Sequence, residues 1–246
     1  VTTARKAYET TRQTGNLRDR ANAAAAVALE NAASVDAGSR FPAEAIAMIK
    51  EQRLMGILVP QKLGGEGASI SDAAEVCYTL GRACGSTGMI YAMHLVKVAC
   101  IVNHGMGNAW QENILRRLDM EQLLFASSTT EGMGGGNVRS SASAIQYDNG
   151  RISLERDASV ISYGAYADGL VTTARRAEAS DATDQVLAVF MKEDYDLALT
   201  GGWDTLGMRG TCSTGFKLTA HGVADQLLPV PYDRIHTQTM TPVAHL

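Results

Sequence analysis

The sequence of 246 residues lacks an uninterrupted apolar run long enough to cross a membrane, because His94 and Lys97 interrupt the best candidate. It also has little excess charge, and a net charge of −4 argues against broad nucleic-acid binding. The first residues, V-T-T-A-R-K, are not followed by the apolar core of a signal peptide. We therefore expect a cytoplasmic protein that binds neither nucleic acid nor membranes.

Cysteine is scarce, and its four positions lack the pairing of a zinc site. Most of these cysteines lie in apolar surroundings, which predicts reduced, packed thiols rather than disulfides. The five histidines show no metal-ligand spacing either, so we expect no bound metal. A G-x-S-x-G elbow is also missing, so the serines, histidines and aspartates indicate no hydrolase of that kind. The cysteines are Cys77, Cys84, Cys100 and Cys212.

Helical patterns run from the start of the chain to about residue 120. Alanine-rich residues 17–34 favour a helix by propensity. A second helix is predicted to open at Phe41-Pro42-Ala43-Glu44, because proline is tolerated in a first turn and an acid there favours the helix dipole. Ser71-Asp72 is predicted to cap a third helix. Residues 86–102 predict a long, nearly apolar central helix, and residues 108–118 a last one.

From about residue 121 the pattern changes to short strands separated by polar turns. Residues 145–148 and 151–154 flank Asn149-Gly150, a strong hairpin dipeptide. Further strands are predicted at residues 170–174, 186–190 and 216–219. Short strands at this spacing suggest a small barrel or sandwich. We therefore predict an α+β chain in which an all-helical domain over residues 1–120 precedes a small antiparallel β-barrel domain over residues 121–234.

The stretch most suited to holding a ligand is residues 125–137, F-A-S-S-T-T-E-G-M-G-G-G-N. A short apolar run leads into four hydroxyl residues, and a glycine-rich turn follows. Glycine lets a ligand approach the backbone, whose N–H groups can hold an anion or a carbonyl oxygen. The hydroxyls add adjustable donors and acceptors. The stretch fits neither the dinucleotide fingerprint nor the P-loop, and a plain turn or linker is the alternative interpretation.

This stretch resembles the T-E-P-G-A-G-S-D flavin loop of the acyl-CoA dehydrogenase family. Gly132 stands where that family usually has proline, and Gly136 where it usually has serine. The residues on the T, E, second G and D positions are Thr130, Glu131, Gly135 and Asn137.

Three other stretches resemble the same family in order and spacing. The first covers residues 41–67, in which F-P-A-E, M-G-I-L-V-P and L-G-G-E-G follow one another. Helix ends and core packing are the alternative explanation for these residues. Residues 159–168 resemble W-I-T-N-G…A-D: Ser162 keeps the hydroxyl that reaches flavin N5 in the family, and Val160 replaces the aromatic residue. W-D-T-L-G-M-R-G-T at residues 203–211 is the closest match, with Arg209 expected to make structural hydrogen bonds or, alternatively, to contact a substrate phosphate.

The resemblance implies an FAD-dependent oxidoreductase that dehydrogenates an acyl thioester at its α,β bond by hydride transfer to flavin N5. It also implies a homo-oligomer and an electron-transfer acceptor protein as partner. Substrate contacts are expected from Met93, His94 and Gly136, although a core histidine is the alternative for His94. The implied cofactor-binding residues are Ser127, Thr129, Thr130, Gly135, Gly136 and Ser162.

No residue of the chain matches the catalytic base of the family, a glutamate that a C-terminal helical domain supplies. We expect residues 235–246 to begin such a domain, and we expect the 246-residue chain alone to be inactive. Two alternatives are a flavin-dependent monooxygenase on the same fold and a non-catalytic flavin-binding homologue. The last alternative is an α+β protein whose turns resemble the family by chance.

Overall fold

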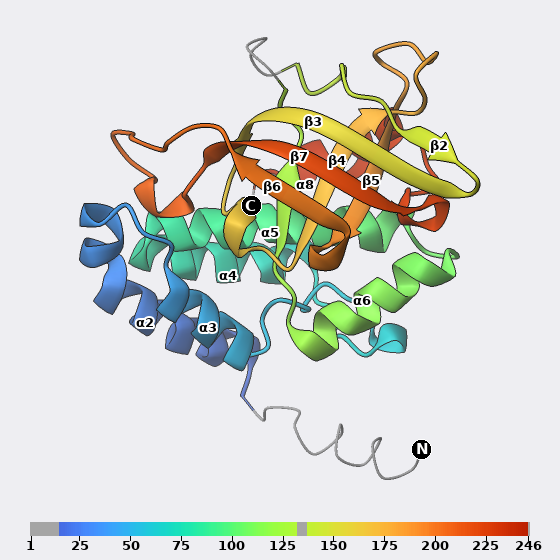
Figure 1. The fold of residues 1–246 in the computed structure, drawn as a ribbon. Helices are drawn as coiled ribbons and strands as arrows, with labels where there is room; N and C mark the ends of the chain where they lie inside the picture. Colours follow the sequence, from blue (N-terminus) through green and yellow to red (C-terminus); the bar gives the residue numbers. More distant parts are fainter. Residues whose placement is uncertain (1–14, 132–136, 246) are drawn as a thin grey trace.

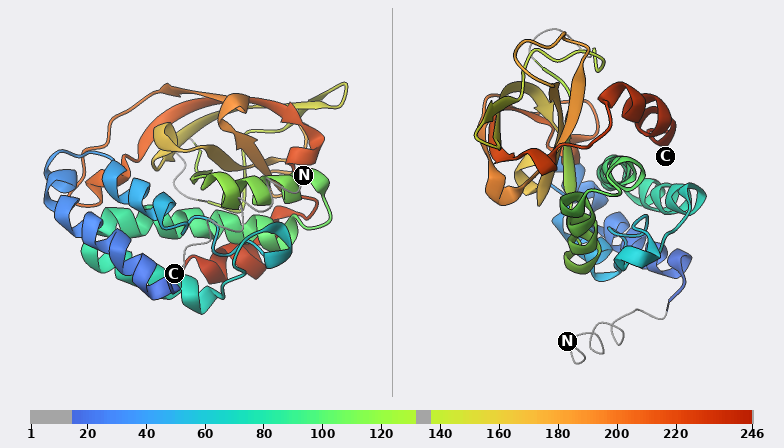
Figure 2. Two further views of the ribbon diagram at one scale, coloured as in Figure 1. Left: turned by 90° about the horizontal axis from the view of Figure 1, so that it is seen from below. Right: turned by 90° about the vertical axis from the view of Figure 1, so that its right-hand side faces the viewer.

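The computed structural model describes residues 15–131 and 137–245, with helices in the first half and strands in the second (Figure 1). In both views of Figure 2 the long helices form one layer of the molecule and the sheets another. The helices of the first half are α2 (Leu17–Ala37), α3 (Ala43–Glu51), α4 (Ile70–Ala83), α5 (Gly85–His104) and α6 (Ala109–Glu121). Short 3-10 helices are η1 (Gln61–Leu63), η2 (Gly164–Tyr166), η3 (Lys192–Asp194), η4 (Arg209–Thr211) and η5 (Ala224–Gln226).

Side-chain caps fix where the helices begin. The Asn16 side chain accepts a hydrogen bond from Asp19 N at the start of α2, and Asn108 does the same for two backbone N–H groups of α6. Helix α4 begins with a capping box between Ser69 and Asp72, in which each side chain accepts from the backbone N–H of the other. The predicted cap at Ser71-Asp72 is therefore two residues too late, although Asp72 takes part.

Helix α5 runs through the middle of the structure. Among the described residues it is the one helix long and apolar enough to cross a membrane, with a mean hydropathy of 1.4 in its most apolar window. The helix has this length and composition although His94 and Lys97 interrupt its apolar run. However, 72% of that window is buried inside the fold, which is how a core helix behaves. Its length and composition therefore reflect its central position among the other elements.

The strands form two hydrogen-bonded sheets, one ordered β1-β4-β5 and the other β2-β3-β7-β6. The closed barrel is not confirmed, since the described strands fall in separate sheets. The expectation of antiparallel strands is wrong for one pair, because β1 runs parallel to β4, with the β2–β3 hairpin in the crossover between them. The strands are β1 (Phe125–Ser128), β2 (Gln146–Asp148), β3 (Arg151–Ile161), β4 (Gly169–Arg175), β5 (Gln185–Met191), β6 (Tyr195–Leu199) and β7 (Thr214–Val223).

The hairpin between β2 and β3 is confirmed. Asn149 and Gly150 both have positive φ values, 48° and 79°, as a tight turn of this kind requires. Strand β6 was not predicted, because its sequence Y-D-L-A-L is mostly exposed and carries little alternation.

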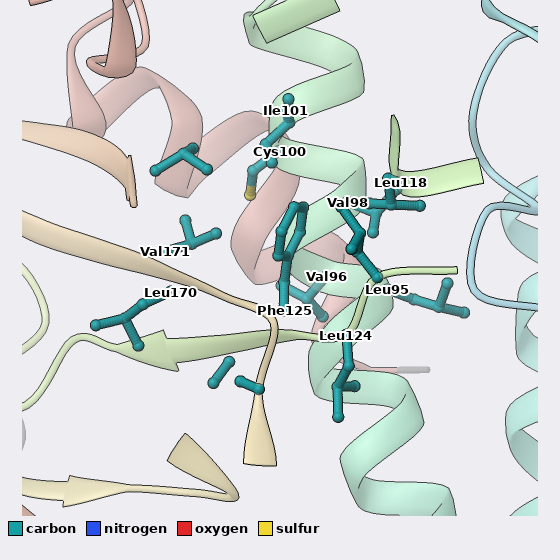
Figure 3. Packing of buried hydrophobic residues seen from close by; sticks show 14 of the residues in the cluster. Leu95, Val96, Val98, Cys100, Ile101, Leu118, Leu124, Phe125, Leu170 and Val171 are labelled. Carbon is teal, nitrogen blue, oxygen red and sulfur yellow. The ribbon is translucent and has the colours of Figure 1, made fainter. Parts of the chain in front are cut away.

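Strand β1 joins the helical layer to the sheets. Figure 3 shows the Phe125 side chain beside α5, between Cys100 and Leu95, with Leu124 just before the strand. Phe125 is fully buried, and one continuous apolar cluster includes side chains from the helices and from both sheets. Burying this surface is the main favourable contribution to the fold. The domain boundaries at residues 120 and 234 stay predictions.

The last described elements lie against α5 (Figure 2). Thr239 Oγ1 accepts a hydrogen bond from Asn103 Nδ2 (3.2 Å) and lies 2.8 Å from His104 Nε2. Lys97 Nζ, which is buried, lies 3.8 Å from Met240 Sδ. Residues 232–243 are thus helical and packed on the central helix. The elements are α7 (Tyr232–Ile235), the π-helix η6 (His236–Met240) and α8 (Thr241–Val243).

Candidate flavin site

The end of β1 meets the end of β3. Thr130 Oγ1 donates a hydrogen bond to Val160 O at 3.1 Å, which joins the hydroxyl stretch to the segment that contains Ser162. These positions are 30 residues apart in the chain. The structure therefore brings together two of the stretches that the sequence singled out.

The hydroxyls that precede Thr130 have no partner in the described part of the chain. Ser127 is nearly buried and Thr129 is half-buried, and neither side chain hydrogen-bonds to a residue that the structure describes. The Ser128 hydroxyl is fully buried and also lacks a partner in the described part of the chain. Since polar groups are normally paired, the hydroxyls of Ser127 and Thr129 have hydrogen-bonding capacity left for a ligand or for water, whereas the Ser128 hydroxyl is fully enclosed. Such donors and acceptors match the polar edge of a flavin ring.

Ser162 lies half-buried just beyond the end of β3. Its Oγ accepts a hydrogen bond from Ser213 Oγ at 2.7 Å, and Ser213 Oγ lies 2.7 Å from Thr211 Oγ1. Tyr163 N donates to Thr211 O at 2.7 Å, so the two segments are joined through the backbone as well. Sequence reasoning missed Ser213, although the adjacent Thr211 belongs to the W-D-T-L-G-M-R-G-T match.

A buried arginine lies beneath the hydroxyl stretch. The Arg156 side chain is fully buried, donates to Thr130 O (3.4 Å) and Thr173 O, and has Nε 3.6 Å from Glu131 Oε1. Burial lowers the pKa of Arg156 to about 10, against the opposing effect of Glu131. Its Nη2 has no partner among the described residues. Sequence reasoning missed Arg156, although the alternation of β3 puts it on the same buried face as Ile152 and Leu154.

Glu131 has a structural role, as expected. Its carboxylate accepts hydrogen bonds from Ala142 N (2.6 Å) and Ser143 N (3.0 Å), so it holds the backbone at residues 142–143 in place. Gly135 and Gly136 lie outside the described residues. Both were predicted to bind the cofactor, and Gly136 was also predicted to contact the substrate.

His94 does not have the geometry of a substrate contact. It is fully buried; its Nε2 donates to Met55 O and its Nδ1 accepts from Phe125 N, each at 3.0 Å. Because both ring nitrogens are occupied by backbone groups, the core-histidine alternative describes His94 correctly. Met93 is half-buried and packs against the apolar cluster. Its predicted contact with substrate stays a prediction.

Arg209 makes the structural hydrogen bonds expected of it. Its guanidinium donates to the Asp36 carboxylate, to Asp36 O (2.9 Å) and to Leu206 O (3.1 Å). Asp36 lies at the end of α2, so this contact joins a helix of the first half to the η4 loop. With a further bond to Thr205 O at 3.3 Å, the guanidinium is engaged by a carboxylate and three carbonyls, which leaves little capacity for a substrate phosphate.

A surface pocket of about 610 Å³ lies near the far end of the glycine-rich stretch. Its volume is within the range of small-molecule sites. Its lining includes Asn137, which occupies the D position of the family loop, with Arg139, Gln185, Tyr232 and His236.

The chain has an acyl-CoA dehydrogenase fold, and its residues 11–119 match the family profile described as acyl-CoA dehydrogenase, N-terminal domain. The resemblance to the acyl-CoA dehydrogenase family is therefore confirmed. The chain is similar to "Probable acyl-CoA dehydrogenase YngJ" of Bacillus subtilis (strain 168), with 25% identity over 182 residues that cover 74% of this chain and 48% of that protein. It thus spans about half the length of that relative.

Solved structures agree on the fold. FMN-bound TdsC from Paenibacillus sp. A11-2, described as a dibenzothiophene monooxygenase, has a TM-score of 0.79 and 19% identity, over 89% of this chain and 55% of that one. Butyryl-CoA dehydrogenase from Megasphaera elsdenii also has a TM-score of 0.79, with 15% identity over 94% of this chain and 63% of that one. The fold is therefore shared by dehydrogenases and monooxygenases.

Proposed function

We propose that this chain is the flavin-binding part of an FAD-dependent oxidoreductase, with the flavin at the junction of β1 and β3. The observation that supports it best is the contact between Thr130 Oγ1 and Val160 O, 3.1 Å long. This contact brings the partnerless hydroxyls of Ser127 and Thr129 to the segment of Ser162. The flavin ring would supply a hydride acceptor at its N5 atom.

The residues of the chain would bind and orient that ring. Ser127 and Thr129 would hydrogen-bond its pyrimidine edge, helped by the backbone at Gly135 and Gly136, and Ser162 would lie at N5. Donors at the pyrimidine edge stabilise negative charge there and so favour reduction of the ring. Helix α5, with Met93, would border the acyl chain.

The reaction we propose is α,β-dehydrogenation of an acyl thioester, supported by the similarity to the probable acyl-CoA dehydrogenase YngJ. Hydrogen bonds to the thioester carbonyl would lower the pKa of its α-proton and so make proton removal feasible. No base is assigned in this chain. We further propose a cytoplasmic homo-oligomer that passes electrons to an acceptor protein.

A flavin-dependent monooxygenase is the second candidate function. The observation that favours it is Val160, which stands where the dehydrogenases have an aromatic residue and cannot stack on a ring. The fold shared with FMN-bound TdsC adds support. In that case FMN would replace FAD at the same hydroxyl row.

Flavin binding by the purified 246-residue chain tests the site. We expect saturable quenching of FAD fluorescence, and about tenfold weaker binding after Ser127→Ala with Thr129→Val, since each lost hydrogen bond is worth about 0.5–1.5 kcal/mol. Thr79→Val is a matched control, because the Thr79 hydroxyl donates to Glu75 O within α4 and does not belong to β1 or β3. A protein that binds neither FAD nor FMN would overturn the proposal.

The two candidate reactions are separated by what happens to the bound flavin. A dehydrogenase supplied with its base would be bleached by acyl-CoA without oxygen, whereas a monooxygenase would show a hydroperoxyflavin-like absorbance when the chemically reduced protein is mixed with oxygen. Without an assigned base, we expect the 246-residue chain to bind flavin but not to reduce a dye with acyl-CoA. Dye reduction by this chain alone would show that the base lies within it.

A further inference from the structure

Three hydroxyl groups form a line that ends at the proposed flavin site. Thr211 and Ser213 are 3% and 4% exposed, whereas Ser162 is half-buried. The oxygen–oxygen distances are 2.7 Å from Thr211 to Ser213 and 2.7 Å from Ser213 to Ser162. The line therefore runs from the protein interior to the one hydroxyl that a ligand could reach. We call these three side chains the hydroxyl relay.

The inner end of the relay reaches a carbonyl group. Met208 O lies 2.8 Å from Thr211 Oγ1 and also accepts from Thr211 N (3.0 Å) and Trp203 Nε1 (3.1 Å). Because two N–H groups already satisfy this oxygen, the Thr211 hydroxyl is free either to bond it or to turn to Ser213. The carbonyl is not left without a partner in either case.

Each hydroxyl has one proton, so the same oxygen positions allow two proton arrangements. In the outward arrangement Thr211 donates to Ser213, Ser213 donates to Ser162, and the Ser162 proton is free for a ligand acceptor. In the inward arrangement Ser162 donates to Ser213, Ser213 to Thr211, and Thr211 to Met208 O. Ser162 then offers only lone pairs, which suit a ligand N–H. The change requires rotation of three hydroxyls and moves no charge.

We propose that the hydroxyl relay lets Ser162 present a donor to oxidised flavin and an acceptor to reduced flavin. This inference rests on the proposed flavin site. N5 of a flavin accepts a hydrogen bond when oxidised and carries a proton when reduced. A hydroxyl held by one fixed partner would suit only one of these states, whereas the relay serves both. Thr211 and Ser213 are thus positioning residues that act through Ser162.

The backbone around the relay is built to hold it. Met208 and Cys212 have left-handed φ values of 56° and 46°, unusual for residues with a side chain. These turns place Thr211 and Ser213 on the same side, facing Ser162. The hydrogen bond from Tyr163 N to Thr211 O fixes the distance between the two segments. The oxygens are therefore held in place before any ligand binds.

Thr211→Val is the decisive variant, because it removes only the innermost hydroxyl of the relay. The outward arrangement survives, since Ser213 can still donate to Ser162. The inward arrangement fails, because the buried Ser213 proton then has no acceptor. We expect reduced flavin to bind about tenfold more weakly, and the affinity for oxidised flavin to stay within twofold of the wild-type value. A tenfold change in this ratio lowers the two-electron midpoint potential of the bound flavin by about 30 mV.

The measurements are dissociation constants for oxidised and dithionite-reduced flavin, together with the midpoint potential of the bound flavin. Thr211→Ser should restore wild-type values. Thr214→Val is a matched control, because the buried Thr214 hydroxyl adjoins Ser213 but has no partner among the described residues. Ser213→Ala should also lower the midpoint potential of the bound flavin. This variant replaces Thr211→Val as the test if Thr211→Val does not fold.

Three results separate the interpretations. Suppose that the wild-type protein binds both flavin states, and that neither Thr211→Val nor Ser213→Ala changes the ratio of the oxidised-flavin and reduced-flavin affinities. That result would overturn the relay and leave the proposed function standing. A Thr211→Val effect that persists in a Ser162→Ala background would also overturn it, because the relay acts only through Ser162. Wild-type protein that binds neither state would overturn the proposed function and the relay together.

Discussion

His94 shows how one buried side chain can join three separate segments. The ring lies on α5 and hydrogen-bonds Met55 O and Phe125 N, so it ties the central helix to a loop and to β1. One nitrogen donates and the other accepts, which fits only the neutral ring with its proton on Nε2. Burial lowers the pKa of His94 to about 4.

The buried neutral ring makes stability depend on pH. Between pH 6.5 and 4 the unfolded chain protonates this histidine while the folded protein does not, so stability is lost as pH falls through that window. The contribution of His94 amounts to about 3 kcal/mol over the window. Urea titrations at pH 7.5, 5.5 and 4.5 measure it. His94→Gln should be less stable at pH 7.5 and should vary less with pH. An equal pH dependence in both proteins would contradict the assignment.

Helices α4 and α5 approach each other through a pair of glycines. A Cβ built on Gly88 of α5 would lie 2.6 Å from Gly81 Cα of α4, which is closer than any real contact of that kind. A Cβ built on Gly81 would meet nothing within 4 Å. The packing therefore leaves no room for a side chain at Gly88, whereas it leaves room for one at Gly81, although both residues lie inside helices.

Alanine substitutions should separate the two glycines. Gly88→Ala forces the helices apart and should destabilise the protein by about 1–3 kcal/mol. Gly81→Ala gains helix propensity without a clash and should stabilise it by about 0.5–1 kcal/mol. Thermal and urea unfolding of both variants measures the difference. Equal destabilisation would mean that the two helices do not pack closely at this point.

The two layers share one large apolar cluster, and a second, small cluster lies among α2, α3 and the end of α4. Strand β1 pairs with β4 on its sheet side and packs on α5 with its side chains, so it belongs to both layers. The apolar cluster likewise contains Leu95 from the helices and Leu218 from the strands. Most of the buried apolar surface of each layer therefore belongs to this shared cluster.

A shared core predicts that both layers unfold in a single transition. The chain has two tryptophans, Trp110 in α6 and Trp203 in the loop between β6 and η4, so each reports on a different half of the sequence. Trp203→Phe and Trp110→Phe leave single probes, whose fluorescence in urea should give coincident midpoints that match circular dichroism. Two separated midpoints would show instead that the predicted domains unfold independently.

Local patterns in the sequence were sufficient to predict much of the architecture. Helix propensity and apolar spacing located α2, α3, α4, α5 and α6, because these signals depend on neighbouring residues. The Asn149-Gly150 turn was predictable for the same reason: its two positive φ values are intrinsic to those residue types. The ordered motifs at residues 41–67, 125–137 and 203–211 were likewise enough to identify the family.

The tertiary structure alone decided the rest, because those features depend on partners distant in the sequence. Ser162 and Ser213 are 51 residues apart, and His94 and Phe125 are 31 apart, so no local pattern could reveal their hydrogen bonds. The parallel pairing of β1 with β4, and the arrangement of the strands in two sheets, also depend on which distant strands meet. The sequence determined which side chains could bind or pack, and the tertiary structure determined which of them are neighbours. The reason is that hydrogen bonds and packing contacts act only at short distances in space.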